Sequence, residues 1–256
     1  MTIKPLTKRL IKTIASLDQS KYRRRERLFK AEGKKCVEDT CRYFQRSCLA
    51  ATETWINEHY EIASLFQEVY AAPASSMAEM SNLASRPEVI AVYQIPESSV
   101  DLTNLRGSLT IALDTIQDPG NLGTIVRIAD WFGVKEILCS RETVDVYNPK
   151  AVMSTMGAIA RVNVHYVDLA ATLRELSETI PVYGTFLNGE NLFNARLSEK
   201  AVVVFGNEGN GICESVASAV NHRLTIPSYP PGQITSESLN VAMAAAITIA
   251  QFRNNG

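Results

Sequence analysis

Short runs of Val, Ile and Leu, separated by helix-like stretches, constrain the fold of this chain more than any other feature. Beyond residue 107 these runs are "SLTIALD", "KEILCS", "ARVNVHYV", "PVYGTFL", "KAVVVFG" and "HRLTIPS". Their apolar residues do not alternate strictly with polar ones, as they would in a sheet with one solvated face. Helices are expected between them, at 121–132, about 149–157, 168–178 and about 236–253. This succession predicts an α/β fold whose mainly parallel sheet is covered on both faces.

The first 100 residues have the pattern of a smaller α/β unit. A basic helix is expected from Lys8 to Leu17, and "CLAATETW", "EVYAAP" and "EVIAVYQIP" have the composition of strands. In "SSMAEMSNLA", Ser76 and Glu79 have the spacing of a capping box and predict a helix start. The polar segment "PESSVDLTNLRG", residues 96–107, is expected to be a linker. The predicted domains are therefore 1–100 and 107–256.

The charges of the chain are distributed unevenly. The formal net charge is −1, but residues 1–35 contain 12 Lys and Arg against three acids, a balance of +9. The remainder therefore carries −10. A strongly basic segment attached to an acidic chain predicts a polyanionic partner for that segment.

Cysteine, histidine and hydropathy patterns exclude several classes of protein. The five cysteines include no C-x-x-C pair and there are only three histidines, so neither a zinc site nor a disulfide framework is expected. No apolar run reaches the length of a membrane span. The start, "MTIKPLTKRLIK", has no apolar segment after its charges, so no secretory signal is expected. These features predict a reduced, cytoplasmic protein with no metal and no membrane partner.

The stretch "DPGNLGTIVRIADWFGV", residues 118–134, predicts a tight turn followed by an amphipathic helix. Pro119 and Gly120 suit the central positions of a type II turn, and Asn121 is expected at the helix N-cap. Gly133 is expected to end the helix. Apolar residues at helical spacing predict the buried face, which comprises Leu122, Ile125, Val126, Ala129 and Phe132.

Arg127 lies off this apolar face, and two interpretations are open. Helical side chains lean towards the N-terminus, so its guanidinium would reach back towards the turn. That turn follows the strand "SLTIALD", and open α/β sheets bind ligands at the carboxyl ends of their strands. In the other interpretation Arg127 is a surface residue paired with Asp130.

Two further loops carry residues that suit a binding site. In "VVVFGNEGNGI" an apolar strand runs into three glycines, which let a ligand approach the backbone, and into the charge of Glu208. In "LTIPSYPPGQITSESLNVAMAAAITIAQFR" a Pro- and Gly-rich loop leads into a small-residue helix, with Ser238 and Asn240 near its start. Each segment also has an ordinary structural explanation. The first can be a simple strand-to-helix turn, and the small residues of the second can serve close helix packing, which would suit a dimer interface.

Together and in this order, the three segments resemble the SpoU/TrmH family of RNA ribose 2′-O-methyltransferases, within the SPOUT superfamily. The resemblance spans roughly residues 108–253. The family's helix-opening N-L-G and its following arginine are matched by Asn121 and Arg127. A strand followed by G-[NA]-E-x-x-G is matched by Gly206, Asn207, Glu208 and Gly211. The pattern I-P…S-L-N-V is matched by Ile226, Pro227, Ser238, Leu239, Asn240 and Val241.

The resemblance extends to the N-terminal region. Mainly through "RRRERLFKAEGKKCVEDT", residues 1–100 resemble the RNA-binding domain, similar to a kink-turn-binding ribosomal protein, that precedes the catalytic domain in many members. The implied architecture is thus a small α/β RNA substrate-binding domain at 1–100 and a SpoU-type methyltransferase domain at 107–256. The family fold includes a deep C-terminal trefoil knot, which residue spacing alone does not predict.

The resemblance also implies a cofactor and an assembly. The knot would bind S-adenosylmethionine, and family members act as homodimers whose active site is completed across the interface. The loop "YPPGQITSE" is longer than is usual in the family and is expected to change a wall of the cofactor site near Ile226. The implied cofactor-binding residues are Thr185, Gly206, Asn207, Ile226 and Leu239.

The implied reaction is methyl transfer to a ribose 2′-hydroxyl of RNA, with rRNA preferred. Arginine stays protonated, so Arg127 is expected to orient the hydroxyl and stabilise its developing negative charge; a general-base role would require a large pKa depression. No metal is required, because the cofactor brings the activated methyl group. The residues expected to arrange Arg127 and the ribose are Asn121, Glu208, Ser238 and Asn240.

The basic N-terminal segment is expected to bind the RNA. Its cations can neutralise phosphates largely independently of sequence, and Tyr22 and Phe29 can stack on unpaired bases. A run of charged residues is more commonly the solvated face of a helix. For each basic residue taken singly, this remains the alternative to RNA binding. The RNA-binding candidates are Lys21, Arg23, Arg24, Arg25 and Arg27.

Three other functions fit parts of the pattern. A tRNA 2′-O-methyltransferase would use the same residues on another substrate. A Rossmann-type nucleotide enzyme would carry G-x-G-x-x-G after its first strand, which "LDTIQDPGNLG" lacks. A non-catalytic RNA-binding protein of the same fold would have no need of the polar residues that the three motifs supply.

Overall fold

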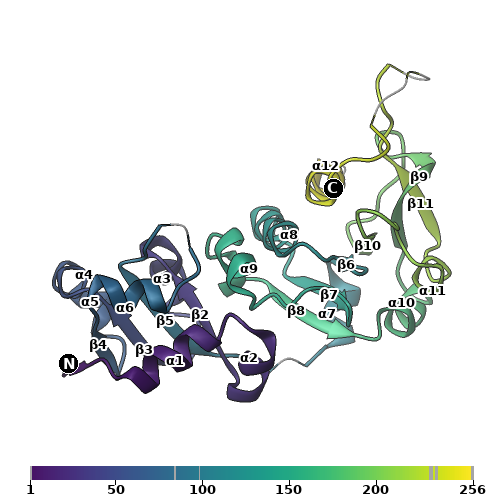
Figure 1. The fold of residues 1–256 in the computed structure, drawn as a ribbon. Coiled ribbons are helices and arrows are strands. Elements are labelled where there is room, and N and C mark those ends of the chain that lie inside the picture. The colour runs from purple at the N-terminus through teal and green to yellow at the C-terminus, as the bar shows by residue number, and fades with distance from the viewer. Residues whose placement is uncertain (1, 84, 98, 231–232, 234–235, 255–256) are drawn as a thin grey trace. The chain divides into compact units, whose positions relative to one another are not determined.

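Two compact units make up the structure, a computed structural model that describes residues 2–83, 85–97, 99–230, 233 and 236–254 (Figure 1). The N-terminal unit comprises residues 1–97 and 145–160, and the C-terminal unit comprises residues 98–144 and 161–256. The chain therefore passes between the units three times. The predicted domain boundaries, at 1–100 and 107–256, stay a prediction.

The C-terminal unit contains a six-stranded sheet in the order β11-β9-β10-β6-β7-β8. Within the described residues, the strand pairings of this sheet are all parallel, as the apolar runs predicted. Parallel neighbours place the carboxyl ends of these strands along one edge of the sheet. The strands are β6 (Leu109–Leu113), β7 (Glu136–Ser140), β8 (Asn163–Val167), β9 (Val182–Asn191), β10 (Ala201–Phe205) and β11 (His222–Thr225).

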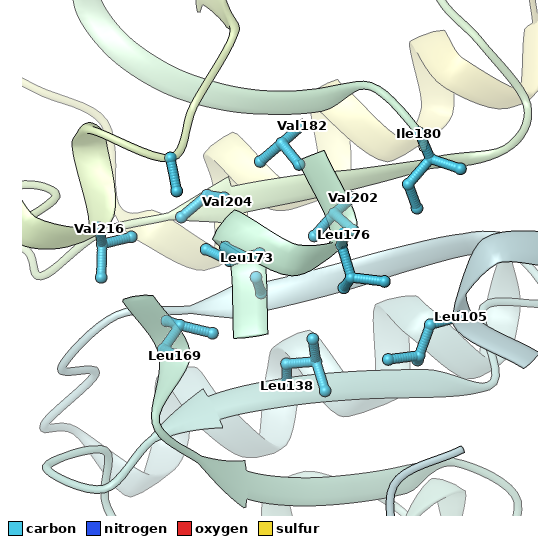
Figure 2. Packing of buried hydrophobic residues seen from close by; sticks show 12 residues of the cluster. Leu105, Leu138, Leu169, Leu173, Leu176, Ile180, Val182, Val202, Val204 and Val216 are labelled. Carbon is cyan, nitrogen blue, oxygen red and sulfur yellow. The ribbon is translucent and has the colours of Figure 1, made fainter. Parts of the chain in front are cut away.

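Helices connect these strands and cover the sheet. They are α7 (Leu102–Gly107), α8 (Pro119–Trp131), α10 (Leu169–Ser177), α11 (Glu214–Ala217) and α12 (Val241–Asn254). Figure 2 shows Leu173 and Leu176 of α10 among the buried Val and Leu side chains of the strands. The helices α8 and α12 pack on each other, and Arg253 Nε donates to the carbonyl of Phe132 at 2.8 Å.

The start of α8 differs from the prediction. The N-cap is Asp118, whose carboxylate accepts the backbone N–H of Asn121 at 2.9 Å, so Asn121 lies inside the first turn. Pro119 and Gly120 are helical rather than central in a type II turn, because proline suits the first helical position. Gly133 ends the helix with φ 67°, as predicted. The predicted apolar face is buried except for Phe132, which is half-buried.

Two other boundaries of this unit were predicted wrongly. The segment 96–107, expected to be a linker, contains α7, whose first turn is capped by Asp101. The last helix begins at Val241 rather than near residue 236, because Asn240 caps it through its side-chain oxygen. Within the described ranges, no helix combines the length and hydropathy needed to cross a bilayer.

The N-terminal unit is built on a five-stranded mixed sheet in the order β1-β4-β3-β5-β2. Strand β5, next to the edge strand β2, runs antiparallel to both of its neighbours, β2 and β3. The remaining pairs, β1 with β4 and β3 with β4, are parallel. The strands are β1 (Ile3–Pro5), β2 (Leu28–Glu32), β3 (Arg46–Ala51), β4 (Val69–Ala71) and β5 (Val89–Gln94).

The helices of this unit are mostly short. They are α1 (Lys8–Ser16), α2 (Ser20–Glu26), α3 (Lys34–Thr40), α4 (Glu53–Glu58), α5 (Tyr60–Ala63), α6 (Ala74–Glu79), α9 (Pro149–Ser154) and the 3₁₀ turn η1 (Ala158–Ala160). The predicted capping box is absent from α6, where Pro73 is the N-cap and makes no side-chain bond. Within "CLAATETW" the strand ends at Ala51, because Thr52 accepts the N–H of Trp55 and starts α4.

Residues 145–160 are integral to the N-terminal unit, although they follow β7 in the chain. The ring of Tyr147 lies 4.7 Å from that of Phe29, and α9 packs on β2. Gly157 has φ 85°, and a Cβ there would lie 2.4 Å from the Cβ of Asp39. Both the positive φ and the short distance to Asp39 therefore require glycine at this position, where the segment packs against α3.

Candidate active site in the C-terminal unit

Three residues from separate motifs form one hydrogen-bonded cluster. Asn121 Nδ2 donates to Glu208 Oε1 at 2.6 Å, and Asn240 Nδ2 donates to Asn121 Oδ1 at 3.0 Å. The three residues come from α8, from the loop after β10 and from the residue before α12. The structure thus joins three of the predicted catalytic residues, which we call the Asn121–Glu208–Asn240 cluster.

The orientation of each amide in this cluster is determined by the backbone around it. Asn240 Oδ1 accepts the N–H groups of Ala242 and Met243 at 2.9 and 3.3 Å, which leaves its Nδ2 to face Asn121. Asn121 must then accept through Oδ1, so its Nδ2 donates to the Glu208 carboxylate. Residues at the N-termini of α8 and α12 therefore determine the position of the Glu208 carboxylate.

The loop that carries Glu208 is held rigidly by its neighbours. A Cβ on Gly206 would lie 2.2 Å from the carbonyl carbon of Gly211, so only glycine fits there. Asn207 and Gly211 exchange two backbone hydrogen bonds of 2.9 Å. Asn207 Oδ1 accepts the N–H groups of Gly209 and Asn210, and its Nδ2 donates to the carbonyl of Thr115 at 2.9 Å. The loop consequently presents an exposed Glu208 with little freedom.

A buried carboxylate outside the set of predicted site residues supports the same region. Asp114 follows β6 directly and is buried, and its Oδ2 accepts the N–H of Cys213 at 2.7 Å. Its Oδ1 accepts the hydroxyl of Thr115 at 3.0 Å. Asp114 therefore joins the end of β6 to the loop after β10. An acid at the end of the apolar run "LTIALD" was the available signal.

The predicted cofactor residues lie mainly at the carboxyl ends of three adjacent strands, β10, β9 and β11. Gly206 follows β10, and Ile226 follows β11. Thr185 begins an irregular stretch of β9, since Arg223 of β11 pairs with Gly184 whereas Leu224 pairs with Glu190. The Thr185 hydroxyl donates to the carbonyl of Val204 at 3.2 Å.

A separate cavity opens at the other strands of this sheet. It has a volume of about 450 Å³ and lies at the ends of β6, β7 and β8. Its lining combines charged and small polar side chains, and it includes none of the predicted cofactor residues. The charged and polar residues include Asp114, Ser140, Arg141, Glu142, Asp168 and Ser215.

Arg127 is exposed on α8, and in the described part of the chain it makes no hydrogen bond or ion pair. The alternative pairing with Asp130 is wrong, because Asp130 binds the guanidinium of Arg161 at 2.7 Å. Ser238 is likewise exposed and makes no hydrogen bond to a described residue. Among the described residues, neither side chain makes a hydrogen bond or ion pair with the Asn121–Glu208–Asn240 cluster.

Part of the longer loop before α12 lies outside the described residues. Residues 231–232 and 234–235 lie outside the described residues, so the predicted change to the wall near Ile226 stays a prediction. Leu239, just beyond the loop, is 49% exposed. Among the described residues, no group of three or more His, Cys, Asp and Glu side chains has the arrangement of a metal site.

The RNA-binding candidates of the N-terminal unit differ in their surroundings. Lys21, Arg24, Arg25 and Arg27 are exposed, and Lys21 and Arg25 lie over the ring of Tyr22, 4.8 and 4.9 Å from its centre. Arg23 contradicts the prediction, because its buried guanidinium binds Asp145 at 2.6 Å and cannot reach a phosphate. Phe29 is also buried, so it is unable to stack on a base.

Comparisons of the sequence with known proteins identify both parts of the chain. Residues 108–250 match the SpoU rRNA Methylase family, and residues 8–91 match the MRM3-like substrate binding domain. The chain is 31% identical over 247 residues, 95% of either protein, to the Bacillus subtilis 23S rRNA (guanosine(2553)-2′-O)-methyltransferase RlmP. It is also 31% identical over 195 residues to the 23S rRNA (guanosine-2′-O-)-methyltransferase RlmB of Neisseria meningitidis, covering 72% of this chain and 76% of that protein.

Solved structures agree over nearly the whole chain. A Porphyromonas gingivalis protein assigned to the TrmH family of RNA methyltransferases superposes with a TM-score of 0.85 at 35% identity, covering 99% of this chain and 100% of that one. An AdoMet-bound rRNA methyltransferase from Sinorhizobium meliloti gives 0.84 at 25% identity, covering 98% of both chains. The observed α/β architecture matches these structures. The chain belongs to the SpoU rRNA methylase family.

Proposed function

We propose that this protein transfers a methyl group from S-adenosylmethionine to a ribose 2′-hydroxyl of 23S rRNA. The observation that carries the proposal is the Asn121–Glu208–Asn240 cluster, which joins three motifs of the family in one place. The relatives named above support rRNA as the substrate, because both are 23S rRNA 2′-O-methyltransferases. A tRNA substrate is the second candidate, on the resemblance alone.

The residues at the predicted cofactor site suit S-adenosylmethionine. Ile226 and Leu239 supply partly exposed apolar surface for an adenosine, and the Gly206 loop presents backbone groups at a strand end. Thr185 and Asn207 hold neighbouring backbone in place through their side chains. When bound, the cofactor supplies a sulfonium methyl group that is already activated for transfer, so no metal is needed.

Arg127 would act on the attacking hydroxyl. Its guanidinium is exposed and makes no hydrogen bond or ion pair to the described residues, so its positive charge can bind the RNA phosphate and stabilise negative charge on the ribose oxygen. The Asn121–Glu208–Asn240 cluster would position the ribose through its exposed carboxylate. Ser238, two residues before Asn240, makes no hydrogen bond to a described residue and would donate to the same sugar.

We further propose that two copies complete the active site. Among the described residues Arg127 makes no hydrogen bond or ion pair with the cluster of its own chain, which favours a site where the arginine and the cluster come from different protomers. Trp131, on the same helix as Arg127, is 84% exposed and would be covered in such a dimer. The trefoil knot and the likeness of residues 1–100 to a kink-turn-binding ribosomal protein belong to this proposal as well.

The test is transfer of labelled methyl groups from S-adenosylmethionine to deproteinised 23S rRNA and, separately, to total tRNA. Nuclease digestion of the product would identify any 2′-O-methylated nucleotide. Arg127→Ala should lower the transfer rate by roughly 10²–10³-fold, as expected when one charge-stabilising donor is removed. Binding of S-adenosylmethionine, measured by calorimetry, should be unchanged.

A matched control is Arg174→Ala, which removes an exposed arginine from α10 of the same unit and should leave transfer unchanged. Label in tRNA alone would assign the second substrate class. If wild type binds S-adenosylmethionine but labels neither pool, free RNA is not the substrate. If it does not bind the cofactor at all, the proposed function is wrong.

A further inference from the structure

A small cavity in the N-terminal unit has the lining of a nucleobase site. It encloses about 330 Å³, within the usual range for small ligands, and is lined by residues of three segments. The lining residues are Arg27, Tyr43, Phe44, Gln45, Gln94, Ile95, Pro96 and Glu97. We propose that this cavity binds an unpaired nucleobase of the RNA substrate, an inference that rests on the proposed function.

The backbone around the cavity is well fixed. Gln94 N–H donates to the carbonyl of Gln45 at 2.9 Å, and Ile95 N–H donates to the carbonyl of Arg27 at 2.8 Å. Tyr43 N–H donates to the carbonyl of Thr40 at 3.0 Å, which continues the turn after α3. The three segments are thus pinned together at the start of β2 and the end of β5. Gly33, which follows β2, lies at the other end of this strand pair.

Two aromatic side chains in the lining of the cavity, Tyr43 and Phe44, suit a stacked base. The ring of Phe44 packs edge-on against Phe29 at 5.0 Å and lies 5.7 Å from Tyr93, so it is anchored in the core. Tyr43 is 59% exposed, and its ring has no aromatic partner in the described chain. Stacking on an accessible aromatic ring is the usual way in which proteins hold unpaired RNA bases.

Polar groups around the aromatic residues complete the site. The side-chain amides of Gln45 and Gln94 are exposed and make no hydrogen bond to described residues, so both can read the edge of a base. The guanidinium of Arg27 lies 3.4 Å from the carbonyl of Ile95 and 4.0 Å from the Glu97 carboxylate. These weak contacts leave Arg27 able to bind a phosphate.

Charge favours RNA over a protein partner at this site. The exposed Arg42 and Arg46 flank Tyr43 and Gln45 in the chain, and the exposed cations of α2 lead directly to Arg27. The one acid lining the cavity, Glu97, is almost fully exposed and can turn away from a phosphate. A cavity that is lined by an arginine and an exposed aromatic ring, and that has further exposed arginines next to its lining residues in the chain, fits a nucleotide better than an apolar peptide.

The test uses the full chain and a 12-nucleotide single-stranded RNA that carries one 2-aminopurine. Binding is followed by anisotropy, and stacking by quenching of the 2-aminopurine fluorescence. Tyr43→Ala should weaken binding by about 5- to 100-fold and remove the quenching, the effect of losing one stacked base. Tyr43→Phe should bind within about twofold of wild type, because the ring is kept.

The matched control is Tyr60→Ala, since Tyr60 is 57% exposed in the same unit but does not line the cavity. Unchanged affinity and quenching in Tyr43→Ala would overturn the proposal, as would equal binding and quenching by the same sequence in a duplex. Methyl transfer to 23S rRNA is measured on the same preparations. A wild type that neither transfers methyl groups nor binds S-adenosylmethionine would refute the proposed function, whereas the oligonucleotide comparison would still decide whether the cavity binds a base.

Discussion

The buried pair of Arg23 and Asp145 allows a quantitative prediction about the stability of the N-terminal unit. The Arg23 side chain is 2% exposed, and two of its nitrogens donate to Asp145 Oδ2 at 2.8 and 2.6 Å. Its third donor serves the carbonyls of Leu17 and Asp18 at 2.8 and 3.0 Å. Without the Arg23 guanidinium, the Asp145 carboxylate and the carbonyls of Leu17 and Asp18 lose their donor. Without the Asp145 carboxylate, the buried guanidinium has no counter-charge. Arg23→Met and Asp145→Asn should each destabilise the unit by about 3–5 kcal/mol.

The two tryptophans provide the assay. Trp55 is buried in the N-terminal unit, and Trp131 is exposed in the C-terminal unit. In a Trp131→Phe background, the fluorescence of Trp55 during urea unfolding reports on the N-terminal unit alone. The double variant Arg23→Met/Asp145→Asn should be destabilised by at least about 1 kcal/mol less than the sum of the two single variants, because the two residues share one interaction.

The control is Arg24→Ala, which removes an exposed neighbouring arginine and should change stability by less than about 0.5 kcal/mol. The same variant should weaken RNA binding at low salt, which separates the two adjacent residues by role. Additive single effects in the cycle, or a loss below about 1 kcal/mol for Arg23→Met, would refute the argument that this pair is buried and coupled.

Two further outcomes are expected. Gly206→Ala should abolish methyl transfer and S-adenosylmethionine binding without unfolding the N-terminal unit, because a Cβ would lie 2.2 Å from the carbonyl carbon of Gly211; calorimetry with near-normal affinity would contradict this. Of the five free cysteines, only the exposed Cys213 should react rapidly with Ellman's reagent at pH 8. Burial raises the pKa of Cys36 and Cys48 to about 12, so at this pH their thiolate forms are scarce, and all five thiols should react in denaturant.

The sheet of the C-terminal unit was predictable because its signals are local. Each apolar run was expected to be a strand, and β6, β7, β8 and β10 lie within the expected segments. The start of α8 was misplaced because Asp118 and Asn121 are both good N-caps. Pro119 decides between them, since its ring suits the first helical position and leaves Asp118 outside.

Long-range contacts set the limit of such reasoning. Arg23 belongs to a basic run that reads as a solvated helix face, and its burial depends on a partner 122 residues further along the chain. The contacts of Asn121 with Glu208 and Asn240 span 87 and 119 residues. That these three residues belong to one site was predicted only because their motifs, in this order, resemble those of the SpoU/TrmH family. The cavity beside Tyr43 had no sequence signal, because its residues are common types in three unrelated segments.

The position of residues 145–160 in the N-terminal unit has a consequence for how this chain can be made and divided. During synthesis, residues 1–97 emerge from the ribosome well before the carboxylate that pairs with Arg23 and the ring that packs on Phe29. Until residue 160 has emerged, a buried cation and an aromatic surface lack their partners. An expression fragment that ends near residue 100 should therefore aggregate or require a chaperone, whereas a fragment completed by a grafted 145–160 segment should fold.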